Sequence, residues 1–206
     1  GNQSAKHQTA ENQGTEGNCW AFSAMAALES CIIKATNGDF RLDLSEANMK
    51  NLMAMYSDYG YAKEVNGGGT NTMVYGYLAS WLGPIYEAND TYYINDYLSP
   101  LLKSILHIQN ILILKRESYT DNDGIKEAIL RYGAVSTGMY YDSEYLRNNA
   151  YYYKGDEDHG NHAVCIVGWD DNYSKSNFKN TPPGDGAWIV RNSWGPSWGN
   201  NGYFYL

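Results

Sequence analysis

The hydrophobic pattern of this chain changes character once, at Gly133. Before that point apolar residues recur at the three- and four-residue spacing of helices, and after it short β-branched and aromatic runs alternate with Gly, Asn, Asp and Pro. Helical segments followed by strands favour an α+β fold over alternating βαβ units. We therefore expect two lobes, one mainly helical and one built on a sheet, with a cleft where the first helix meets the sheet.

Four helices are expected before Gly133. The first covers residues 19–34 and is apolar nearly all round, so it should be buried on most sides. The second follows Ser45 as its N-cap, the third covers residues 71–82, and the fourth follows Asp123 as its cap.

Strands are expected at residues 135–141, 162–169, 187–192 and from 202 onward. Residues 92–118 are ambiguous, because their first half has helical spacing whereas residues 111–114 resemble a strand. The chain ends at Leu206 in what looks like a strand cut short, so we expect it to be a piece of something longer.

Composition narrows the range of functions. The net charge is −8 and no cluster of Lys and Arg is present, which argues against binding nucleic acid or an anionic membrane. No apolar run approaches the roughly 18 residues of a membrane span. The 20 tyrosines and few lysines favour a protein found outside the cell or at its surface.

One cysteine stands where reactive thiols occur. Cys19 follows a glycine-bearing loop and opens the first expected helix. A helix N-terminus presents free N–H groups and a partial positive charge, which favours thiolate over thiol and should lower the pKa of the cysteine. An isolated cysteine is more often a buried structural residue, so this position needs support from elsewhere in the chain.

That support comes from two later segments. His162 opens an expected strand and Asn192 closes another. A thiolate beside an imidazolium can attack a carbonyl, the histidine can then protonate the leaving amine, and an amide oxygen can orient the ring.

The three segments resemble the papain and cathepsin family of cysteine peptidases. The residues concerned are Cys-Trp-Ala-Phe-Ser at 19–23, Asn-His-Ala-Val at 161–164 and Asn-Ser-Trp-Gly at 192–195. The resemblance implies a papain-like fold, with a helical lobe at residues 19–107 and a β-barrel-like lobe made of residues 1–18 and 108–206. It also implies a cysteine endopeptidase that needs no cofactor, in which Cys19 is the nucleophile, His162 the base and acid, and Asn192 the residue that orients the histidine.

Further site residues follow from the resemblance alone. Gln13, six residues before the cysteine, corresponds to the side chain that donates to the oxyanion. The resemblance assigns three other groups: a substrate-facing strip of Asn66, Gly67 and Gly68; a pocket wall of Gly69, Thr70, Gly138, Gly160 and Ala163 for the second side chain before the scissile bond; and two flanking aromatics, Trp194 and Trp198. Because the wall residues are all small, we expect a roomy pocket that accepts a bulky apolar or aromatic side chain.

The chain lacks one disulfide of the family pattern. Family members usually carry a disulfide between the loop before the nucleophile and the residue before the glycine strip, whereas this chain has Glu16 and Val65 there. We therefore expect a variant stabilised by packing, of a prokaryotic type. Cys31 and Cys165 have no family role, and we expect structural burial for both, with a bridge between them as a minor alternative.

The implied partner is a polypeptide substrate, with a propeptide or a protein inhibitor as a further occupant of the cleft, and we expect a monomer. Two alternatives use the same residues: an inert binding or adhesion module of a surface protein, and an enzyme that transfers acyl groups or cleaves cell-wall peptides. A metal site is disfavoured, because the chain has no C-x-x-C motif and no closely spaced histidine pair.

Overall fold

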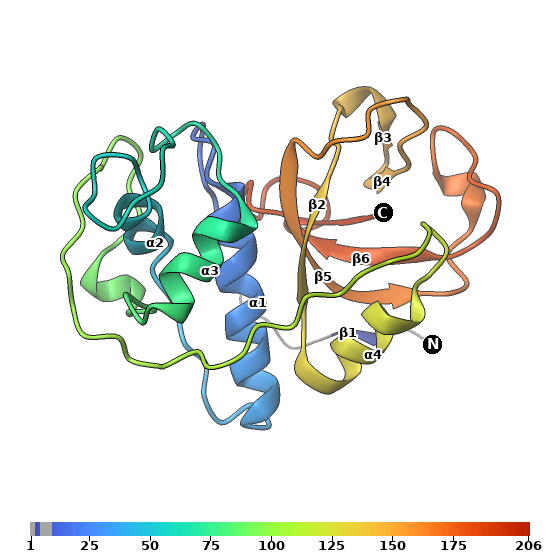
Figure 1. The fold of residues 1–206 in the computed structure, drawn as a ribbon. Coiled ribbons are helices and arrows are strands. Elements are labelled where there is room, and N and C mark those ends of the chain that lie inside the picture. Colours follow the sequence, from blue (N-terminus) through green and yellow to red (C-terminus); the bar gives the residue numbers. More distant parts are fainter. Residues whose placement is uncertain (1–2, 5–9) are drawn as a thin grey trace.

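A helical side and a sheet side make up the computed structural model, which describes residues 3–4 and 10–206, and α1 (Cys19–Ala35) stands between them (Figure 1). The helical side carries α2 (Glu46–Leu52), α3 (Asn71–Ala79) and the short turn η1 (Glu87–Asn89). This segregation confirms the expected α+β fold.

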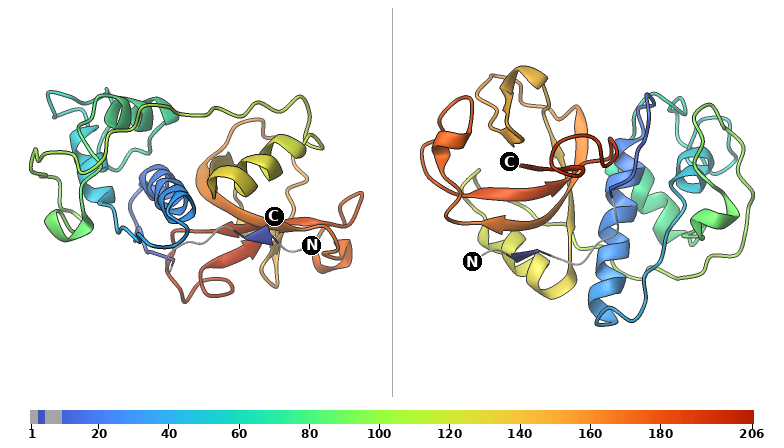
Figure 2. Two further views of the ribbon diagram at one scale, coloured as in Figure 1. Left: turned by 90° about the horizontal axis from the view of Figure 1, so that it is seen from below. Right: turned by 180° about the vertical axis from the view of Figure 1, so that it is seen from behind.

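The first helix is the element on which both sides pack. Its Ala24 and Met25 belong to the core of the helical side, and its Ala26 belongs to the core of the sheet side. The small alanine side chains allow neighbouring elements to approach the helix closely, and Figure 2 shows α1 with elements on either flank. The helix therefore places its N-terminal residue, Cys19, at the junction of the two sides. Among the described residues, no helix is both long and apolar enough to cross a membrane.

The other helices agree with the sequence patterns to within a few residues. Ser45 caps α2, since its hydroxyl accepts a hydrogen bond from the Asn48 N–H at 3.0 Å. The third helix ends at Ala79, three residues before the expected end. The fourth, α4 (Asp123–Tyr132), is preceded by Asn122 as its N-cap residue, so the prediction of Asp123 as the cap was wrong by one position.

The sheet has the order β1-β5-β6-β7-β4-β3, with β2 also paired to β5. Its long central members are β5 (His162–Asp170), β6 (Ala187–Arg191) and β2 (Val135–Met139), and all three pair antiparallel. The shorter strands are β1 (Gln3–Ser4), β3 (Leu146–Arg147), β4 (Ala150–Tyr151) and β7 (Tyr203–Tyr205), and the turns η2 (Ser143–Tyr145) and η3 (Lys175–Asn177) lie in the loops. The expected strands are thus present, while β1, β3 and β4 were not foreseen.

Residues 92–118 contain neither a helix nor a strand, so both readings of this stretch were wrong. The segment runs along the outer face of the helical side and then crosses to the sheet side, as the green to yellow-green trace in Figure 1 shows. Its backbone is held by distant partners instead of a regular ladder; the Ile105 N–H, for example, donates to the Pro84 carbonyl at 2.9 Å.

Candidate active site

Cys19 is the first residue of α1 and its side chain is half-buried. Asn18 precedes it without a side-chain cap, and the first turn carries no acidic residue. The N–H groups of Cys19 and Trp20 at the helix start act on the thiol and favour the thiolate. The sulfur also accepts a hydrogen bond from the Ala163 N–H, with an N···Sγ distance of 3.4 Å. The thiol therefore lies beside the start of β5, next to the residue that follows His162.

His162 and Asn192 form a direct hydrogen bond, with Nε2 and Oδ1 2.8 Å apart. The amide orientation follows from a second contact, because Oδ1 also accepts from the Ser193 N–H at 2.8 Å and a backbone N–H can only donate. The imidazole Nε2 must then carry the hydrogen, which leaves Nδ1 as the nitrogen that can take up a proton. Asn192 thus selects one tautomer of a histidine that is only 8% exposed.

Burial disfavours the charged forms of both Cys19 and His162. Burial raises the pKa of the Cys19 thiol above its usual 9.0, against the lowering effect of the N–H groups of Ala163, Trp20 and Cys19 itself. Burial also lowers the pKa of His162 below its usual 6.5, against the effect of its hydrogen bond to Asn192. The helix start acts in the expected direction, but desolvation outweighs it. An ion pair at this site therefore depends on the two charges forming together, so that each stabilises the other.

Gln13 is held at both ends of its side-chain amide. Its Oε1 accepts from the Ser193 hydroxyl at 2.5 Å, and its Nε2 donates to the Glu16 carbonyl at 2.7 Å. An amide nitrogen has two hydrogens, so one remains for another acceptor. The backbone is fixed as well, because the Gln13 N–H donates to the Ser193 carbonyl at 2.8 Å. The residue has the rigidity that an oxyanion donor needs.

Aromatic rings cover the histidine. Trp194 stacks on the imidazole with a centroid separation of 4.6 Å, and Trp198 meets Trp194 edge to face at 5.1 Å. Tyr141, which the sequence analysis did not single out, contacts Trp194 at 4.8 Å. The hydrogen bond between His162 and Asn192 is itself buried.

The glycine strip lies against the loop that precedes Cys19. A Cβ on Gly17 would come within 2.6 Å of the Asn66 carbonyl oxygen and 3.1 Å of the Gly68 nitrogen. A Cβ on Gly69 would lie 2.4 Å from the Trp20 ring. Side chains at Gly17 and Gly69 would push the two segments apart, which explains why this sequence has glycine there. Gly67 is exposed beside these contacts.

The expected pocket wall comes from both sides of the molecule. Gly138 pairs with Ala163 across β2 and β5, and a Cβ on Gly160 would lie 3.2 Å from the Met139 carbonyl oxygen. Ala163 packs against the core of the helical side. Thr70 is the N-cap residue of α3 on that side. Gly138, Gly160 and Ala163 therefore lie close together where β2 pairs with the start of β5.

A hollow of about 700 Å³ is lined by residues of both the helical side and the sheet side. None of the five predicted wall residues lines it, but their near neighbours Asn71 and Ser136 do. The rest of its lining is largely apolar and comes from α1, α3, residues 108–114 and the end of α4.

Cys31 and Cys165 are both free, so the bridge considered as an alternative is absent. Cys165 lies in the core of the sheet side, as expected, and burial raises the pKa of its thiol to about 12. Cys31 is only half-buried and lines the 700 Å³ hollow, so the expectation of structural burial was wrong for it.

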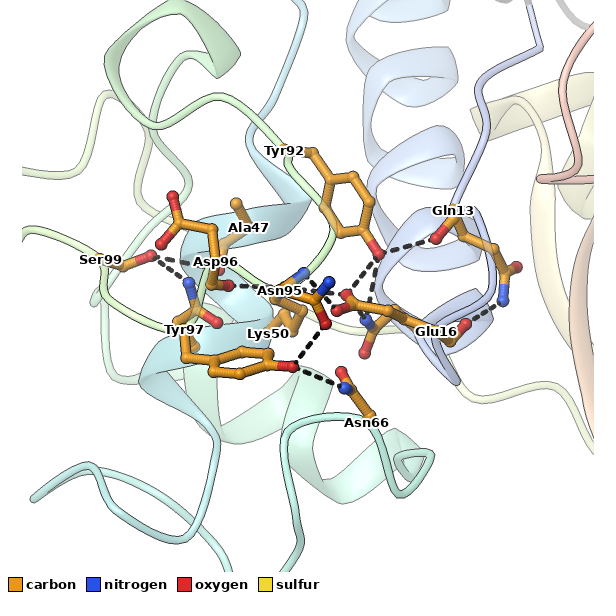
Figure 3. A network of polar contacts seen from close by, with 12 residues as sticks. Gln13, Glu16, Ala47, Lys50, Asn66, Tyr92, Asn95, Asp96, Tyr97 and Ser99 are labelled. Carbon is orange, nitrogen blue, oxygen red and sulfur yellow. Dashed lines mark hydrogen bonds and ion pairs between the residues drawn. The ribbon is translucent and has the colours of Figure 1, made fainter.

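Sequence reasoning missed the surroundings of Glu16, shown in Figure 3. The carboxylate pairs with Lys50 of α2, and Tyr92 from the irregular segment joins them. One signal was present: Glu16 replaces a cysteine that the family pattern leads one to expect. Its partners lie 34 and 76 residues away, and no periodicity could indicate them.

The site lies between a helical side and a sheet side. It combines a thiol at a helix start, an imidazole with an orienting amide, and a fixed amide donor. This combination defines the class of two-lobed cysteine peptidases. The chain belongs to the papain family of cysteine proteases, whose family description matches residues 2–206.

Individual relatives agree with this assignment. Cathepsin K of Mus musculus is 30% identical over 201 residues, and a cysteine protease of Blomia tropicalis is 29% identical over 214 residues. The matches cover 95% and 99% of this chain but 55% and 59% of the relatives, so the chain spans little more than half the length of these proteins. Among solved structures, the clostridial cysteine protease Cwp84 after propeptide cleavage has a TM-score of 0.85 at 32% identity, over 97% of this chain and 50% of that one.

Proposed function

We propose that this chain is the catalytic part of a cysteine endopeptidase that hydrolyses peptide bonds through a thioester intermediate. One observation carries the proposal: the Cys19 sulfur lies 3.4 Å from the amide nitrogen that follows His162, while His162 is hydrogen-bonded to Asn192 at 2.8 Å. The residue roles and lobe boundaries of the sequence analysis are kept in this proposal; residues 1–2 and 5–9 of the sheet lobe lie outside the described part.

In the first half of the reaction His162 Nδ1 takes the proton of the Cys19 thiol, and the thiolate attacks the scissile carbonyl carbon. The developing oxyanion accepts from the Gln13 amide and from the backbone N–H of Cys19. His162 then donates its proton to the leaving amine as the C–N bond breaks, leaving the acyl group on sulfur.

In the second half His162 Nδ1 takes a proton from water, which attacks the thioester carbonyl. The second tetrahedral intermediate collapses, the C–S bond breaks, and the proton returns to the pair of Cys19 and His162. Throughout, Asn192 holds the ring in the tautomer that keeps Nδ1 available, and Trp194 covers that hydrogen bond.

The proposed substrate is an extended polypeptide lying along Asn66, Gly67 and Gly68, where exposed backbone can pair with it as an added strand. The small side chains of the wall residues support a bulky apolar side chain at the second position before the scissile bond. A peptide library tests this choice: enrichment of Leu, Phe or Tyr at that position supports it, and enrichment of Gly or Ala contradicts it.

We further propose that the protein acts as a monomer, outside the cell or at its surface, and that a propeptide or a protein inhibitor can occupy the cleft. Cwp84 supports the location, being described as a surface layer associated protein, and its structure after propeptide cleavage supports a propeptide. No observation favours the inert module or the acyl-transfer enzyme over hydrolysis.

Labelling by a thiol-directed epoxide, mapped by mass spectrometry, tests the proposal. The expected result is a single modified cysteine, Cys19, together with loss of peptide cleavage in proportion to labelling. A folded, reduced sample that is not labelled at Cys19 would contradict the proposal and favour an inert module.

A further inference from the structure

Glu16 and Lys50 form an ion pair that is almost completely shielded from water. Their Oε2 and Nζ atoms are 3.1 Å apart, and the two side chains are 3% and 0% exposed. The Glu16 carboxylate accepts three further hydrogen bonds, from Asn18 Nδ2 at 2.9 Å, from the Asn95 N–H at 2.8 Å and from the Tyr92 hydroxyl at 2.9 Å. Burial acts to raise the pKa of Glu16, but the hydrogen bonds from Asn95 and Tyr92 and the Lys50 ammonium outweigh it and hold the pKa below 4.5.

Lys50 ties this loop to the rest of the helical side. Its ammonium donates to the Asp96 carbonyl at 2.9 Å and lies 4.8 Å from the centroid of the Tyr92 ring and 5.6 Å from that of Tyr97. Figure 3 shows α2 and residues 92–99 converging on the Glu16 carboxylate through these contacts. The pair therefore joins three segments that are distant in the sequence.

The same network reaches Gln13 along two routes. Through the backbone, the Glu16 carbonyl accepts the hydrogen bond from Gln13 Nε2 at 2.7 Å. Through Tyr92, the phenol oxygen lies 2.9 Å from both the Gln13 carbonyl oxygen and Glu16 Oε2. The amide that we assign to the oxyanion is thus held by a residue whose own side chain is fixed by Lys50.

We propose that the buried pair of Glu16 and Lys50 is a positioning device for the oxyanion donor Gln13. Glu16 stands at one of the two positions where the family pattern leads one to expect a disulfide, the other being Val65. The pair holds the same loop by charge and hydrogen bonds, with Lys50 of α2 as its second anchor. This inference rests on the proposed function. It assigns a role in the reaction to two residues that never touch the substrate.

The physical reason is that a buried charge without its partner is strongly unfavourable, so the site must rearrange when one partner is removed. In Lys50→Met the Glu16 carboxylate loses its counterion, and the loop must shift to hydrate it. The Gln13 amide then loses its fixed direction. Because that amide acts on the developing oxyanion rather than on the bound substrate, kcat should fall while KM changes little.

A double-mutant cycle tests this coupling, using steady-state cleavage of a fluorogenic peptide with an apolar residue two positions before the scissile bond. Removing one oxyanion donor typically costs a factor of about 100 to 1,000 in kcat, so Lys50→Met, which displaces the donor, should lower kcat by about 10 to 100. In a Gln13→Ala background the same substitution should lower kcat by less than about threefold, because the donor it positions is gone. The matched control is Lys126→Met, which removes an exposed ion pair to Asp171 and should leave kcat unchanged.

The outcomes separate this inference from the proposed function. If the unmodified protein cleaves no peptide, the proposed function fails first. If it is active and Lys50→Met lowers kcat equally in both backgrounds, the pair acts on something other than Gln13 and the inference is overturned. If Lys50→Met does not fold, the same cycle is run with Tyr92→Phe, which removes only one hydroxyl; loss of kcat confined to the Gln13 background supports the inference, and equal or no loss contradicts it.

Discussion

Replacing Glu29 by Gln should make the protein more stable at pH 8 while changing little at pH 5. Glu29 is 1% exposed within α1, and burial, followed by the charge of Glu11, raises its pKa from 4.5 to about 8. Its Oε1 accepts from the Leu44 N–H at 2.9 Å, a bond that the Gln oxygen can keep, and its Oε2 lies 3.9 Å from an Arg191 nitrogen.

The sign follows from proton binding. Between pH 4.5 and 8 the folded state keeps a proton on Glu29 that the unfolded state has lost, so the free energy of unfolding falls as pH rises through this range. At about 1.4 kcal/mol per pH unit, the interval between the two pKa values corresponds to at most about 5 kcal/mol at pH 8. Neighbouring carboxylates act in the same direction, since burial raises the pKa of Glu87 to about 7 and also raises the pKa of Glu11 and Glu46.

Urea denaturation at pH 5, 6, 7 and 8 measures the effect. We expect the stability of the unmodified protein to decrease by several kcal/mol across this range and that of Glu29→Gln to decrease by a few kcal/mol less. The matched control is Glu127→Gln, whose carboxylate is 66% exposed on α4 beside Arg131 and whose loss should leave the pH dependence unchanged. Burial lowers the pKa of His162, so this residue makes the free energy of unfolding rise with pH in the lower part of the range. All three proteins contain His162, so its effect cancels in the comparison. Parallel pH curves for Glu29→Gln and the unmodified protein would refute the reasoning.

Three further predictions concern the site residues and the free cysteines. Gln13→Ala should lower kcat by about 100- to 1,000-fold, or about 3 to 4 kcal/mol, with little change in KM, and an unchanged kcat would exclude Gln13 as an oxyanion donor. Asn192→Ala removes the acceptor that fixes the His162 tautomer and should lower kcat at least about tenfold without unfolding the protein, as followed by circular dichroism; full activity would show that the ring needs no such partner. Because all three cysteines are free, thermal unfolding should occur at the same temperature with and without excess dithiothreitol, whereas a lowered midpoint would reveal a disulfide.

Local signals predicted the elements that carry the site. The glycine-bearing loop and the alanine-rich run fixed the start of α1 at Cys19, and the hydroxyl of Ser45 marked the start of α2. Short strands ending in turn residues placed His162 and Asn192 at strand ends. These features depend on neighbours within a few positions, which is why the sequence alone indicates them.

Tertiary contacts decided the rest. Residues 92–118 have periodicity without regular structure, because their side chains pack onto surfaces made elsewhere: the Tyr92 ring meets Phe22 at 4.8 Å, and Ile105 and Ile108 pack on the helical core. Likewise the sequence indicated Glu16 only as a departure from the family pattern. Its ion pair with Lys50 could not be predicted, because the fold brings these two distant residues together. The pKa of Cys19 shows the same limit, because the helix start was foreseen but the larger effect of burial was not.

The pH dependence of Cys19 alkylation by iodoacetamide tests the central claim most directly. A thiolate that exists because His162 holds its proton should react at a plateau rate across weakly acidic to neutral pH, and His162→Ala should abolish that plateau and leave a single rise above pH 9. Coinciding curves for the two proteins, each rising only above pH 9, would show that the histidine does not share the proton of the thiol and would contradict the account.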